Sequence, residues 1–587
     1  MNKQTKLRKI PYGETDFIAI RKENSYYVDK TRFIEKIEAS SKYLFFIRPR
    51  RFGKSLWLSV MECYYDISQK DHFEEIFKGT YIYDNPTEEK NSYLILKFNF
   101  SEVKANIDKV EDSFNLTIKL GVLKFIKKYE TYLNDKDGKK YEIIENCNDA
   151  SEILKYLISF IEGRGKIYLL IDEYDNFTNT IISSKGQEQY KAITHGEGFY
   201  RHFFNVIKAG TTDIGAAISK IFITGVSPVT LDDVTSGFNI GYNVTSLPAF
   251  NEMVGFTEEE VKGIIEYYKK ELNEFSEDNL EIIRKWYNNY LFSKHEKQRM
   301  YNSDMVLYFI STYMDLKILP EEMLDFNIRT DYMKLRYLII TDLEGKLRIN
   351  GNFEKLKLIL EEGEISSNIN TSFPAHKVID HDNFISLLYY FGLLTIKGQY
   401  EGMLLLGIPN EVTRQLYYEY IRESYRDTKI FNIDLYKLSQ LFRAMAYRGK
   451  WEELFDYLAV EMNSQTALRD YIEGERSIQT FLRAYLNVTN YYITKSEYEL
   501  NKGFCDILLL PNLLNFPDMG YSYLIEIKYI KLSDYSESKL QEKIQIARKQ
   551  LEKYKDDTSL QKFTGTTKLI KIVLVFSGIE LKYKGQE

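Results

Sequence analysis

Three short apolar runs in the first 250 residues, each followed at once by polar residues, predict buried strands. The runs span residues 43–47, 166–171 and 220–224. Apolar runs of this length, bounded by polar residues, are typical of strands that are covered on both faces of a parallel sheet. Ligands of such sheets bind at the carboxyl ends of the strands. The pattern therefore predicts an N-terminal α/β fold with its chemistry at one edge of a parallel sheet.

After about residue 250 the apolar positions change to helical spacing. Thr257 and Glu260 have the spacing of a capping box at the start of a helix. Ile264, Tyr268 and Leu272 then recur at intervals of about one helical turn. We expect a helical segment over residues 251–330.

The residues after the first apolar run form a candidate phosphate-binding loop. They match the end of the pattern G-x-x-x-x-G-K-[ST], and the first glycine of that pattern falls at Arg48. In such loops the glycine lets the backbone approach the phosphates, the lysine reaches the β- and γ-phosphate oxygens, and the serine binds Mg²⁺. A basic turn with a chance Gly-Lys-Ser is the alternative on this pattern alone. The residues that we expect to bind ATP here are Arg51, Phe52, Gly53, Lys54, Ser55 and Leu56.

Polar residues also follow the second and third runs. Asp172 and Glu173 come directly after the second run, and Thr224 ends the third. In phosphate-loop ATPases a carboxylate at this position holds the Mg²⁺ shell, and an adjoining glutamate polarises water. We therefore expect Asp172, with Ser55, to bind Mg²⁺, Glu173 to be catalytic and Thr224 to sense the γ-phosphate. A solvated acidic turn and a strand-end hydroxyl cap are the respective alternatives.

Composition limits the classes of protein. At roughly 150 residues per domain, a chain of 587 residues predicts three or four domains. The chain has 79 Lys and Arg against 85 Asp and Glu, a net charge of −6, which excludes a protein that coats nucleic acid by bulk charge. The first 60 residues nevertheless contain 14 basic and 6 acidic residues. The basic excess thus surrounds the candidate phosphate loop.

The metal ion and the cellular location that we expect follow from residue patterns that the sequence lacks. Three scattered cysteines and six scattered histidines fit neither a disulfide framework nor a His/Cys metal site. Carboxylate-bound Mg²⁺ is therefore the metal that we expect. No apolar run is long enough to span a bilayer, and no apolar segment follows the basic N-terminal residues. We expect a cytoplasmic protein with no membrane partner.

A second acidic group lies near the C-terminus. Asp506 stands early in the apolar run 502–510, and Glu526 and Lys528 stand two residues apart in the run 521–530, hence on one face of a strand. Across a hairpin, Asp506 can meet that face. Two carboxylates that bind Mg²⁺ and a lysine that orients or deprotonates water suit the hydrolysis of a phosphodiester. By spacing alone, an ordinary pair of strands is the alternative.

Taken together, these blocks resemble a known family. The chain contains PYGETDFIAIRKENSYYVDKTRFI, FIRPRRFGKS, LLIDEYDN, FITGVSP and FNEMVGFTEEEV. In them it is similar to the AAA-ATPase-like family, whose members often have a C-terminal nuclease-superfamily domain. Later blocks of the family resemble WYNNYLF, MYNSDMVLYF, YYFGLLTI and LGIPNEV. The resemblance implies ATP binding. It also implies that the replacement of the first loop glycine, here by Arg48, is common in the family, and that residues 27–31 contact the nucleotide. A packed strand is the alternative for those five residues.

The order of elements in the last part of the chain resembles the PD-(D/E)XK nuclease superfamily. The resemblance implies that Asp506 and Glu526 hold Mg²⁺, that Lys528 is catalytic with them, and that DNA is the substrate. It makes Glu475 the acid of the preceding helix, with Glu473 as a rival. The late helix has Gln550 and Tyr554 one turn apart. Its basic residues are either DNA contacts or a solvated face: Lys543, Arg548, Lys549, Lys553 and Lys555.

We therefore predict four segments: an AAA-like P-loop ATPase domain (1–250), a helical lid (251–330), a winged-helix-like linker domain (331–430) and an α/β restriction-endonuclease-like domain of the PD-(D/E)XK type (431–587). The predicted function is ATP binding and hydrolysis coupled to a Mg²⁺-dependent nuclease that acts on DNA. The alternative is a nucleotide-switched binding or signalling protein with an inactive nuclease-like domain. Homo-oligomerisation is left open, and Arg201 is either an arginine finger or a solvated surface residue.

Overall fold

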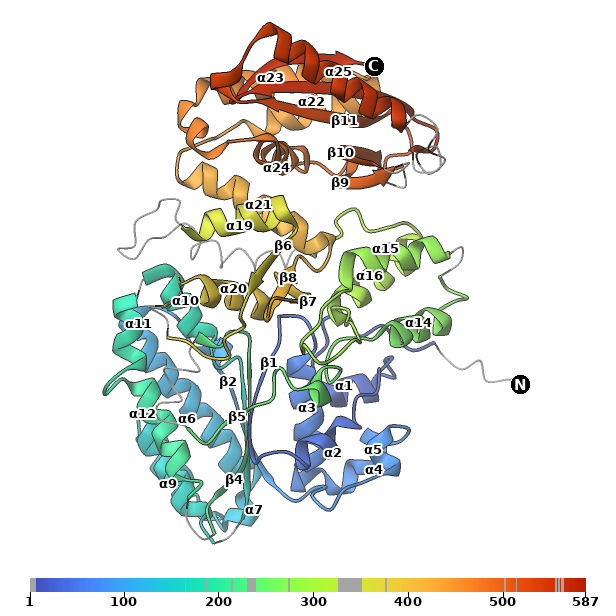
Figure 1. The fold of residues 1–587 in the computed structure, drawn as a ribbon. Helices are drawn as coiled ribbons and strands as arrows, with labels where there is room; N and C mark the ends of the chain where they lie inside the picture. Colours follow the sequence, from blue (N-terminus) through green and yellow to red (C-terminus); the bar gives the residue numbers. More distant parts are fainter. Residues whose placement is uncertain are drawn as a thin grey trace, which may run out of the picture.

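The fold was analysed in a computed structural model of the chain (Figure 1). The described residues are 7–163, 165–185, 187–212, 215–229, 239–272, 275–325, 351–374, 377–378, 380–500, 503–513, 515–554, 557, 560 and 564–587. The N-terminal sheet and its helices lie at one end of the molecule and the C-terminal sheet at the other, with the middle segment between them. Within the described ranges no helix is long and apolar enough to cross a membrane.

In the described part of the chain the N-terminal sheet has five strands, all paired in parallel, in the order β2-β3-β4-β1-β5. The strands are β1 (Tyr43–Ile47), β2 (Leu94–Asn99), β3 (Ile167–Asp172), β4 (Ile218–Gly225) and β5 (Tyr242–Asn243). The three strands predicted from apolar runs are confirmed as β1, β3 and β4. Strands β2 and β5, which complete the sheet, were not predicted.

Helices cover both faces of this sheet (Figure 1). One face has α1 (Phe17–Lys22), α2 (Phe33–Glu38), α3 (Lys54–Tyr65), α4 (Phe73–Phe77) and α5 (Tyr81–Asp84). The other has α6 (Val110–Lys128), α7 (Glu130–Leu133), α9 (Ala150–Ile161), α10 (Asn176–Lys185), α11 (Gln187–Thr194) and α12 (Phe199–Ala209). Helix α8 (Lys139–Asn146) packs on α6 and α9. Phe45 packs in one apolar cluster and its neighbours Leu44 and Phe46 in the other. Burial on both faces explains why β1 is apolar throughout.

The segment after residue 250 is helical, as predicted. It contains α14 (Glu258–Tyr267), α15 (Glu277–Tyr287) and α16 (Ser303–Leu316). The predicted capping box is confirmed, because the Thr257 side chain accepts from the backbone of Glu260 and the Glu260 carboxylate accepts from the backbone of Thr257. Residues 326–330 of the predicted lid lie outside the described ranges.

The described residues of the middle segment contain a three-stranded antiparallel sheet with helices around it, and its assignment as a winged-helix-like linker domain stays a prediction. Its elements are α19 (Gly351–Glu362), β6 (Glu364–Ser367), α20 (His381–Tyr390), β7 (Thr395–Tyr400), β8 (Met403–Gly407) and α21 (Glu411–Asp427). The strand order is β6-β8-β7. Residues 331–350 lie outside the described ranges.

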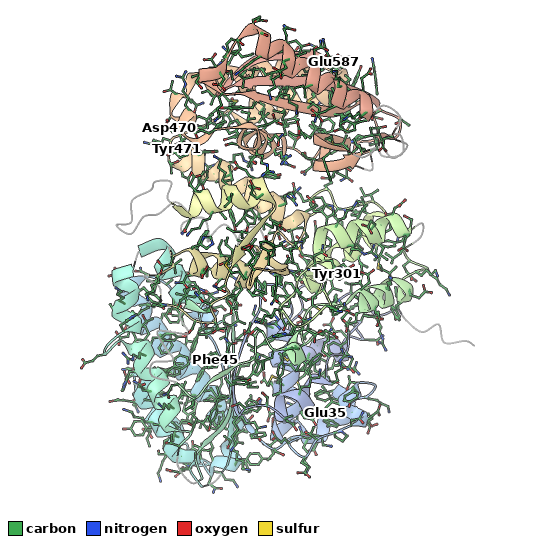
Figure 2. The ribbon with its side chains drawn as sticks, in the orientation of Figure 1. Glu35, Phe45, Tyr301, Asp470, Tyr471 and Glu587 are labelled. Carbon is green, nitrogen blue, oxygen red and sulfur yellow. The ribbon has the colours of Figure 1, made fainter. Side chains whose placement is uncertain are left out.

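The C-terminal segment has a mixed sheet in the order β13-β12-β11-β10-β9, in which β11 and β12 are parallel and the other pairs antiparallel. Its elements are α22 (Leu435–Arg448), α23 (Trp451–Ser464), α24 (Glu475–Leu486), β9 (Tyr492–Leu500), β10 (Gly503–Pro511), β11 (Tyr521–Ile530), α25 (Glu537–Lys553), β12 (Lys568–Ser577) and β13 (Glu580–Gln586). Figure 2 places Phe45 in the N-terminal part, Tyr301 in the helical segment and Glu587 in the C-terminal part.

Candidate active sites

The phosphate-binding loop joins β1 to α3. It ends at Gly53, whose φ of 92° lies in the left-handed region that favours glycine. Helix α3 begins at the next residue, Lys54, so the first N–H groups of the helix follow the loop directly. Strand, loop and helix N-terminus therefore occur in the arrangement that binds a phosphate.

Arg48 stands where the general pattern has its first glycine. Its side chain is 1% exposed and donates to three backbone carbonyl groups at 2.7–2.9 Å, among them those of Thr245 and Phe250. The guanidinium also lies 4.3 Å from the ring centre of Phe292. Arg48 thus ties the start of the loop to the segment after β5 and to the helical segment.

Lys54 is buried within its own loop. Its ammonium donates to the carbonyl oxygens of Arg48 at 3.0 Å and Pro49 at 3.1 Å. Burial lowers the pKa of Lys54, while the charges of Glu173 and Asp172 act in the opposite direction. The lysine is therefore held close to the loop, between its carbonyl groups and the acidic end of β3.

The structure brings two predicted Mg²⁺ ligands together. The Ser55 hydroxyl donates to the Asp172 carboxylate at 2.6 Å, and the backbone N–H of Glu173 donates to the same carboxylate at 3.0 Å. Asp172 is 2% exposed, and burial, followed by the charge of Glu173, raises its pKa. An acidic group whose charged form is disfavoured in this way fits a site for a cation.

The next acidic residues have different environments. Glu173 lines the cavity beside the loop and has a left-handed backbone, with φ 53°. Asp175 is fully buried and accepts from the backbone N–H groups of Val226 and Ser227, at distances from 2.5 to 3.3 Å. Burial raises the pKa of Asp175 to about 6. Asp175 therefore holds the turn after β4, whereas Glu173 lines the cavity.

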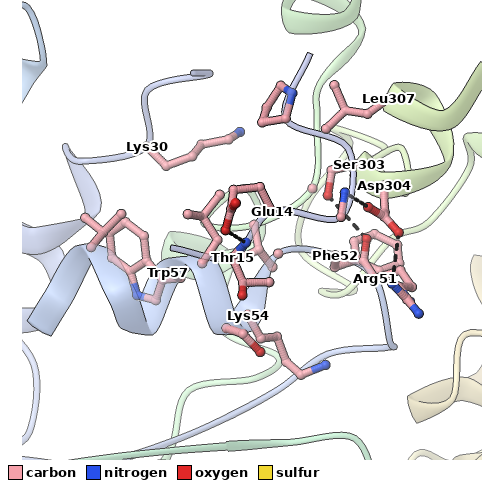
Figure 3. A pocket seen from close by; sticks show the side chains of 18 of the residues that line it. Glu14, Thr15, Lys30, Arg51, Phe52, Lys54, Trp57, Ser303, Asp304 and Leu307 are labelled. Atoms are coloured by element: carbon pink, nitrogen blue, oxygen red, sulfur yellow. Dashed lines mark hydrogen bonds and ion pairs between the residues drawn. The ribbon is translucent and has the colours of Figure 1, made fainter. Parts of the chain in front are cut away.

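A cavity of about 370 Å³ lies beside the phosphate loop (Figure 3). Every residue from Arg50 to Leu56 lines it, together with Asp172 and Glu173. The apolar lining includes Ile20, Tyr27, Val28, Trp57, Val60, Met253 and Leu307. Polar groups around the loop and a largely apolar remainder fit the phosphates and the base of a nucleotide.

Residues 27–31, which precede the phosphate loop, line the cavity only in part. Tyr27, Val28 and Lys30 line the cavity, and Lys30 forms an ion pair with Glu260 of α14 at 2.6 Å. The Asp29 carboxylate instead accepts from two backbone N–H groups, at 2.6 and 2.8 Å. The contact of this block with the nucleotide stays a prediction.

The N-terminus of α16 clamps the phosphate loop, which sequence reasoning missed. Asn302 donates to the carbonyl of Arg50, and both the Ser303 hydroxyl and the Asp304 backbone N–H donate to the carbonyl of Arg51, each at 3.3 Å. The Asp304 carboxylate also forms an ion pair with Arg51 at 3.4 Å. Figure 3 shows this contact beside the cavity. The three residues fall in the block MYNSDMVLYF, whose local pattern predicts only a helix start.

Two further predicted residues lie away from the cavity lining. Thr224 is 1% exposed, and its hydroxyl makes no hydrogen bond to the described part of the chain. Neither Thr224 nor Arg201, on α12, is among the described residues that line the cavity. The sensor and arginine-finger roles remain predictions.

The second site is a lysine surrounded by three carboxylates. Lys528, on β11, lies 3.3 Å from Glu475, 3.4 Å from Glu526 and 3.7 Å from Asp506. These residues come from α24, β10 and β11. Burial opposes the charge of Lys528, but the charges of Asp506, Glu475 and Glu526 raise its pKa. All four predicted catalytic residues of the C-terminal segment therefore meet.

The two carboxylates predicted to bind metal are held differently. Asp506 accepts from the backbone N–H of Ile527 at 2.6 Å. Glu526 is fully buried, and its Oε1 atom has no hydrogen-bond partner in the described chain. Burial and the nearby Asp506 raise the pKa of Glu526. A buried carboxylate oxygen with no donor, next to a second carboxylate, fits a cation. No described group of three or more His, Cys, Asp and Glu side chains is arranged as a metal centre, so the fit rests on this pair.

The structure distinguishes Glu475 from Glu473, the alternative acid at the start of this helix. Glu475 is the first residue of α24 and contacts both Lys528 and the backbone N–H of Tyr529. Glu473 is exposed before the helix.

The late helix has two further polar residues near the site. On α25, the Gln550 Oε1 atom is buried without a hydrogen-bond partner in the described ranges. Directly after the helix, Tyr554 donates to the Phe504 carbonyl at 2.8 Å. Lys555, one of the basic residues considered for DNA contact, lies outside those ranges.

Two family models match the chain. Residues 11–235 match the AAA-ATPase-like family, described as a predicted AAA-ATPase, and residues 473–586 match the PD-(D/E)XK nuclease superfamily. The chain contains an AAA-ATPase-like domain and a PD-(D/E)XK nuclease superfamily domain. The predicted family is thus confirmed. The AAA-ATPase-like domain contains the phosphate loop with Asp172 and Glu173, and the PD-(D/E)XK domain contains all four residues of the second site.

Individual relatives are distant. The "Uncharacterized protein in vnfD 5′region" of Azotobacter chroococcum mcd 1 is 26% identical over 289 residues, which is 48% of this chain and 48% of that protein. The chain therefore spans about half the length of this curated relative. Among solved structures, the Walker-type ATPase PABY2304 of Pyrococcus abyssi is 12% identical, with a TM-score of 0.34, over 66% of this chain and 94% of that chain.

Proposed function

We propose that this protein binds and hydrolyses ATP in the AAA-ATPase-like domain and cleaves DNA in the PD-(D/E)XK domain, with Mg²⁺ in both sites, in the cytoplasm. The observation that carries the proposal is the convergence of Lys528 with Glu475, Asp506 and Glu526, which come from three elements up to 53 residues apart in sequence. A matching group of Lys54, Ser55, Asp172 and Glu173 supports the ATPase half.

In the ATPase site each residue has a distinct task. The Gly53 backbone and the start of α3 bind phosphate oxygens, and Lys54 neutralises their charge. Ser55 and Asp172 would hold Mg²⁺, which supplies positive charge at the β- and γ-phosphates when bound. Glu173, which lines the cavity at the end of β3, accepts a proton from the attacking water.

In the nuclease site Asp506 and Glu526 would hold Mg²⁺, which supplies charge to the scissile phosphate when bound. Lys528 orients the attacking water through its ammonium, and Glu475 positions that ammonium. The buried environment strengthens these electrostatic interactions, since little water screens them.

One observation favours a second candidate, a nucleotide-switched binding protein with an inactive nuclease-like domain. The Lys528 ammonium lies within 3.7 Å of all three carboxylates and so neutralises part of the charge that attracts a cation. In that case the acidic group is structural, and DNA stays intact under every metal and nucleotide condition.

Plasmid cleavage with Mg²⁺ distinguishes the two candidates. The proposal expects nicked or linear plasmid with the wild-type chain and intact plasmid with Asp506→Asn. Asp518→Asn is the matched control, because Asp518 is an exposed aspartate between β10 and β11. Intact plasmid with the folded wild-type chain, with Mg²⁺ or Mn²⁺ and with or without ATP, would overturn the nuclease proposal.

A further inference from the structure

A second cavity, of about 270 Å³, lies where the helical segment, the middle segment and the C-terminal segment meet. Its walls come from α15, from residues 319–323 after α16, from the start of α21, and from residues near the outer ends of the β9–β10 hairpin, namely Asn487, Asn490, Tyr492, Ile493, Thr494, Asn512 and Asn515. It shares no lining residue with the cavity at the phosphate loop, and none with the Lys528 site. Neither proposed reaction uses it.

One part of the lining is aromatic and buried. Trp286 is 9% exposed, Tyr418 4% and Tyr492 5%. Each comes from a different segment of the chain. Large flat side chains of this kind favour a ligand that presents a flat face for stacking.

Another part of the lining is made of side-chain amides. Asn487, Asn490, Asn512, Asn515 and Gln415 all line the cavity. Amide side chains present a donor and an acceptor side by side, and in this way they pair with the edges of nucleobases. The amide nitrogens of the asparagines also donate within the protein, which fixes the orientation of these side chains. Asn487 donates to the Arg483 carbonyl at 2.8 Å, Asn490 to Glu322 at 2.9 Å, Asn512 to the Asn490 carbonyl at 3.2 Å and Asn515 to the Pro320 carbonyl at 3.5 Å.

Two polar atoms of the lining are buried and lack partners. The Thr494 hydroxyl and the Oδ1 atom of Asn515 make no hydrogen bond within the described chain. A buried polar group without a partner costs about 1–3 kcal/mol, so such atoms usually meet a ligand or an ordered water. Both atoms belong to the wall supplied by the PD-(D/E)XK domain.

The charges of the lining almost balance. Lys285 and Arg414 stand against Glu321, Glu322 and Glu411. A site for phosphate or another polyanion would need a clear positive excess. The ligand should therefore be uncharged where it enters the cavity.

We infer that this cavity binds a nucleobase, stacked on the aromatic wall and hydrogen-bonded at its edge by Thr494 and the asparagines. The base belongs either to a free nucleoside or to an unpaired nucleotide of a nucleic acid. Both sources present the same flat face and polar edge, which are the features that proteins recognise in unpaired bases.

Equilibrium dialysis of the full-length chain against adenosine, guanosine, cytidine and thymidine, each without ATP, tests this inference. We expect one of the four to bind at one molecule per chain. Thr494→Val and Asn515→Leu should each weaken binding by about tenfold or more, since each removes one edge contact. Thr494 and Asn515 line the second cavity and not the first, so failure of the ATP proposal would leave this test readable.

Thr489→Val is the matched control. Its hydroxyl is also buried without a partner in the described ranges, but Thr489 does not line the cavity. Unchanged thermal unfolding midpoints for the three variants verify that they fold. The inference is overturned if none of the four nucleosides binds, or if Thr489→Val weakens binding as much as Thr494→Val. A single-stranded oligonucleotide that displaces the bound nucleoside assigns the base to a nucleic acid, and one that does not displace it assigns a free nucleoside.

Discussion

The hydroxyl of Ser55 donates a 2.6 Å hydrogen bond to the carboxylate of Asp172, which lies 117 residues further along the chain. The contact joins the start of α3 to the end of β3 and places both groups beside the loop that carries Lys54. It is the arrangement in which a serine and an aspartate can share one Mg²⁺. The contact therefore links the phosphate loop to the acidic end of β3.

Asp172→Asn keeps an oxygen that can accept from Ser55 but removes the negative charge. ATP binding in the presence of Mg²⁺ should therefore weaken by about tenfold or more, whereas binding measured in EDTA should change little. Titration calorimetry with and without Mg²⁺ gives both values. An equal loss in EDTA would mean that Asp172 acts on the fold of the loop and not on the metal.

Glu173→Gln should separate binding from hydrolysis. The amide keeps the shape of a side chain that lines the cavity but cannot accept a proton, so ATP affinity should stay within about twofold while turnover falls by about 100-fold or more. Phosphate release and calorimetry on the same preparation measure the two effects. Full turnover in this variant would assign the base to another residue.

Arg48→Gly restores the glycine of the general phosphate-loop pattern, and we expect it to be harmful. The change removes three hydrogen bonds to buried carbonyl groups and the contact with the Phe292 ring. The free energy of unfolding should fall by about 3 kcal/mol or more, as measured by urea denaturation. Arg48→Lys should lose less, because it keeps the charge. A glycine variant of wild-type stability would show that the buried arginine is dispensable.

Gly392→Ala tests the contact between the middle segment and the phosphate loop. Gly392 has φ 76°, and a Cβ there would lie 2.8 Å from Pro49. The substitution should reduce stability by about 1 kcal/mol or more and weaken ATP binding, because Pro49 also carries a carbonyl that accepts from Lys54. Gly402→Ala is the matched control, since Gly402 has a similar φ of 83° and no described atom beyond its chain neighbours lies within 4 Å of the added Cβ. Equal effects of the two variants would contradict this coupling.

The sequence predicted those features that depend on local pattern. Strands β1, β3 and β4 are buried on both faces and so appear as apolar runs, whereas β5 has only two residues and leaves no pattern. The clamp by Asn302 and Ser303 joins the loop to a segment 252 residues away, and no local period encodes such a contact. Glu473 and Glu475 are equivalent in sequence, and only the start of α24 selects the one that reaches Lys528.

Parallel assays of phosphate release and plasmid integrity test most directly whether one chain holds two independent catalytic groups. Lys54→Ala should abolish phosphate release, because it removes the charge at the phosphate loop. Lys528→Met should abolish plasmid cleavage while phosphate release continues, with thermal unfolding used to verify that this variant folds. Plasmid cleavage that persists in folded Lys528→Met, or phosphate release that persists in Lys54→Ala, would contradict the account.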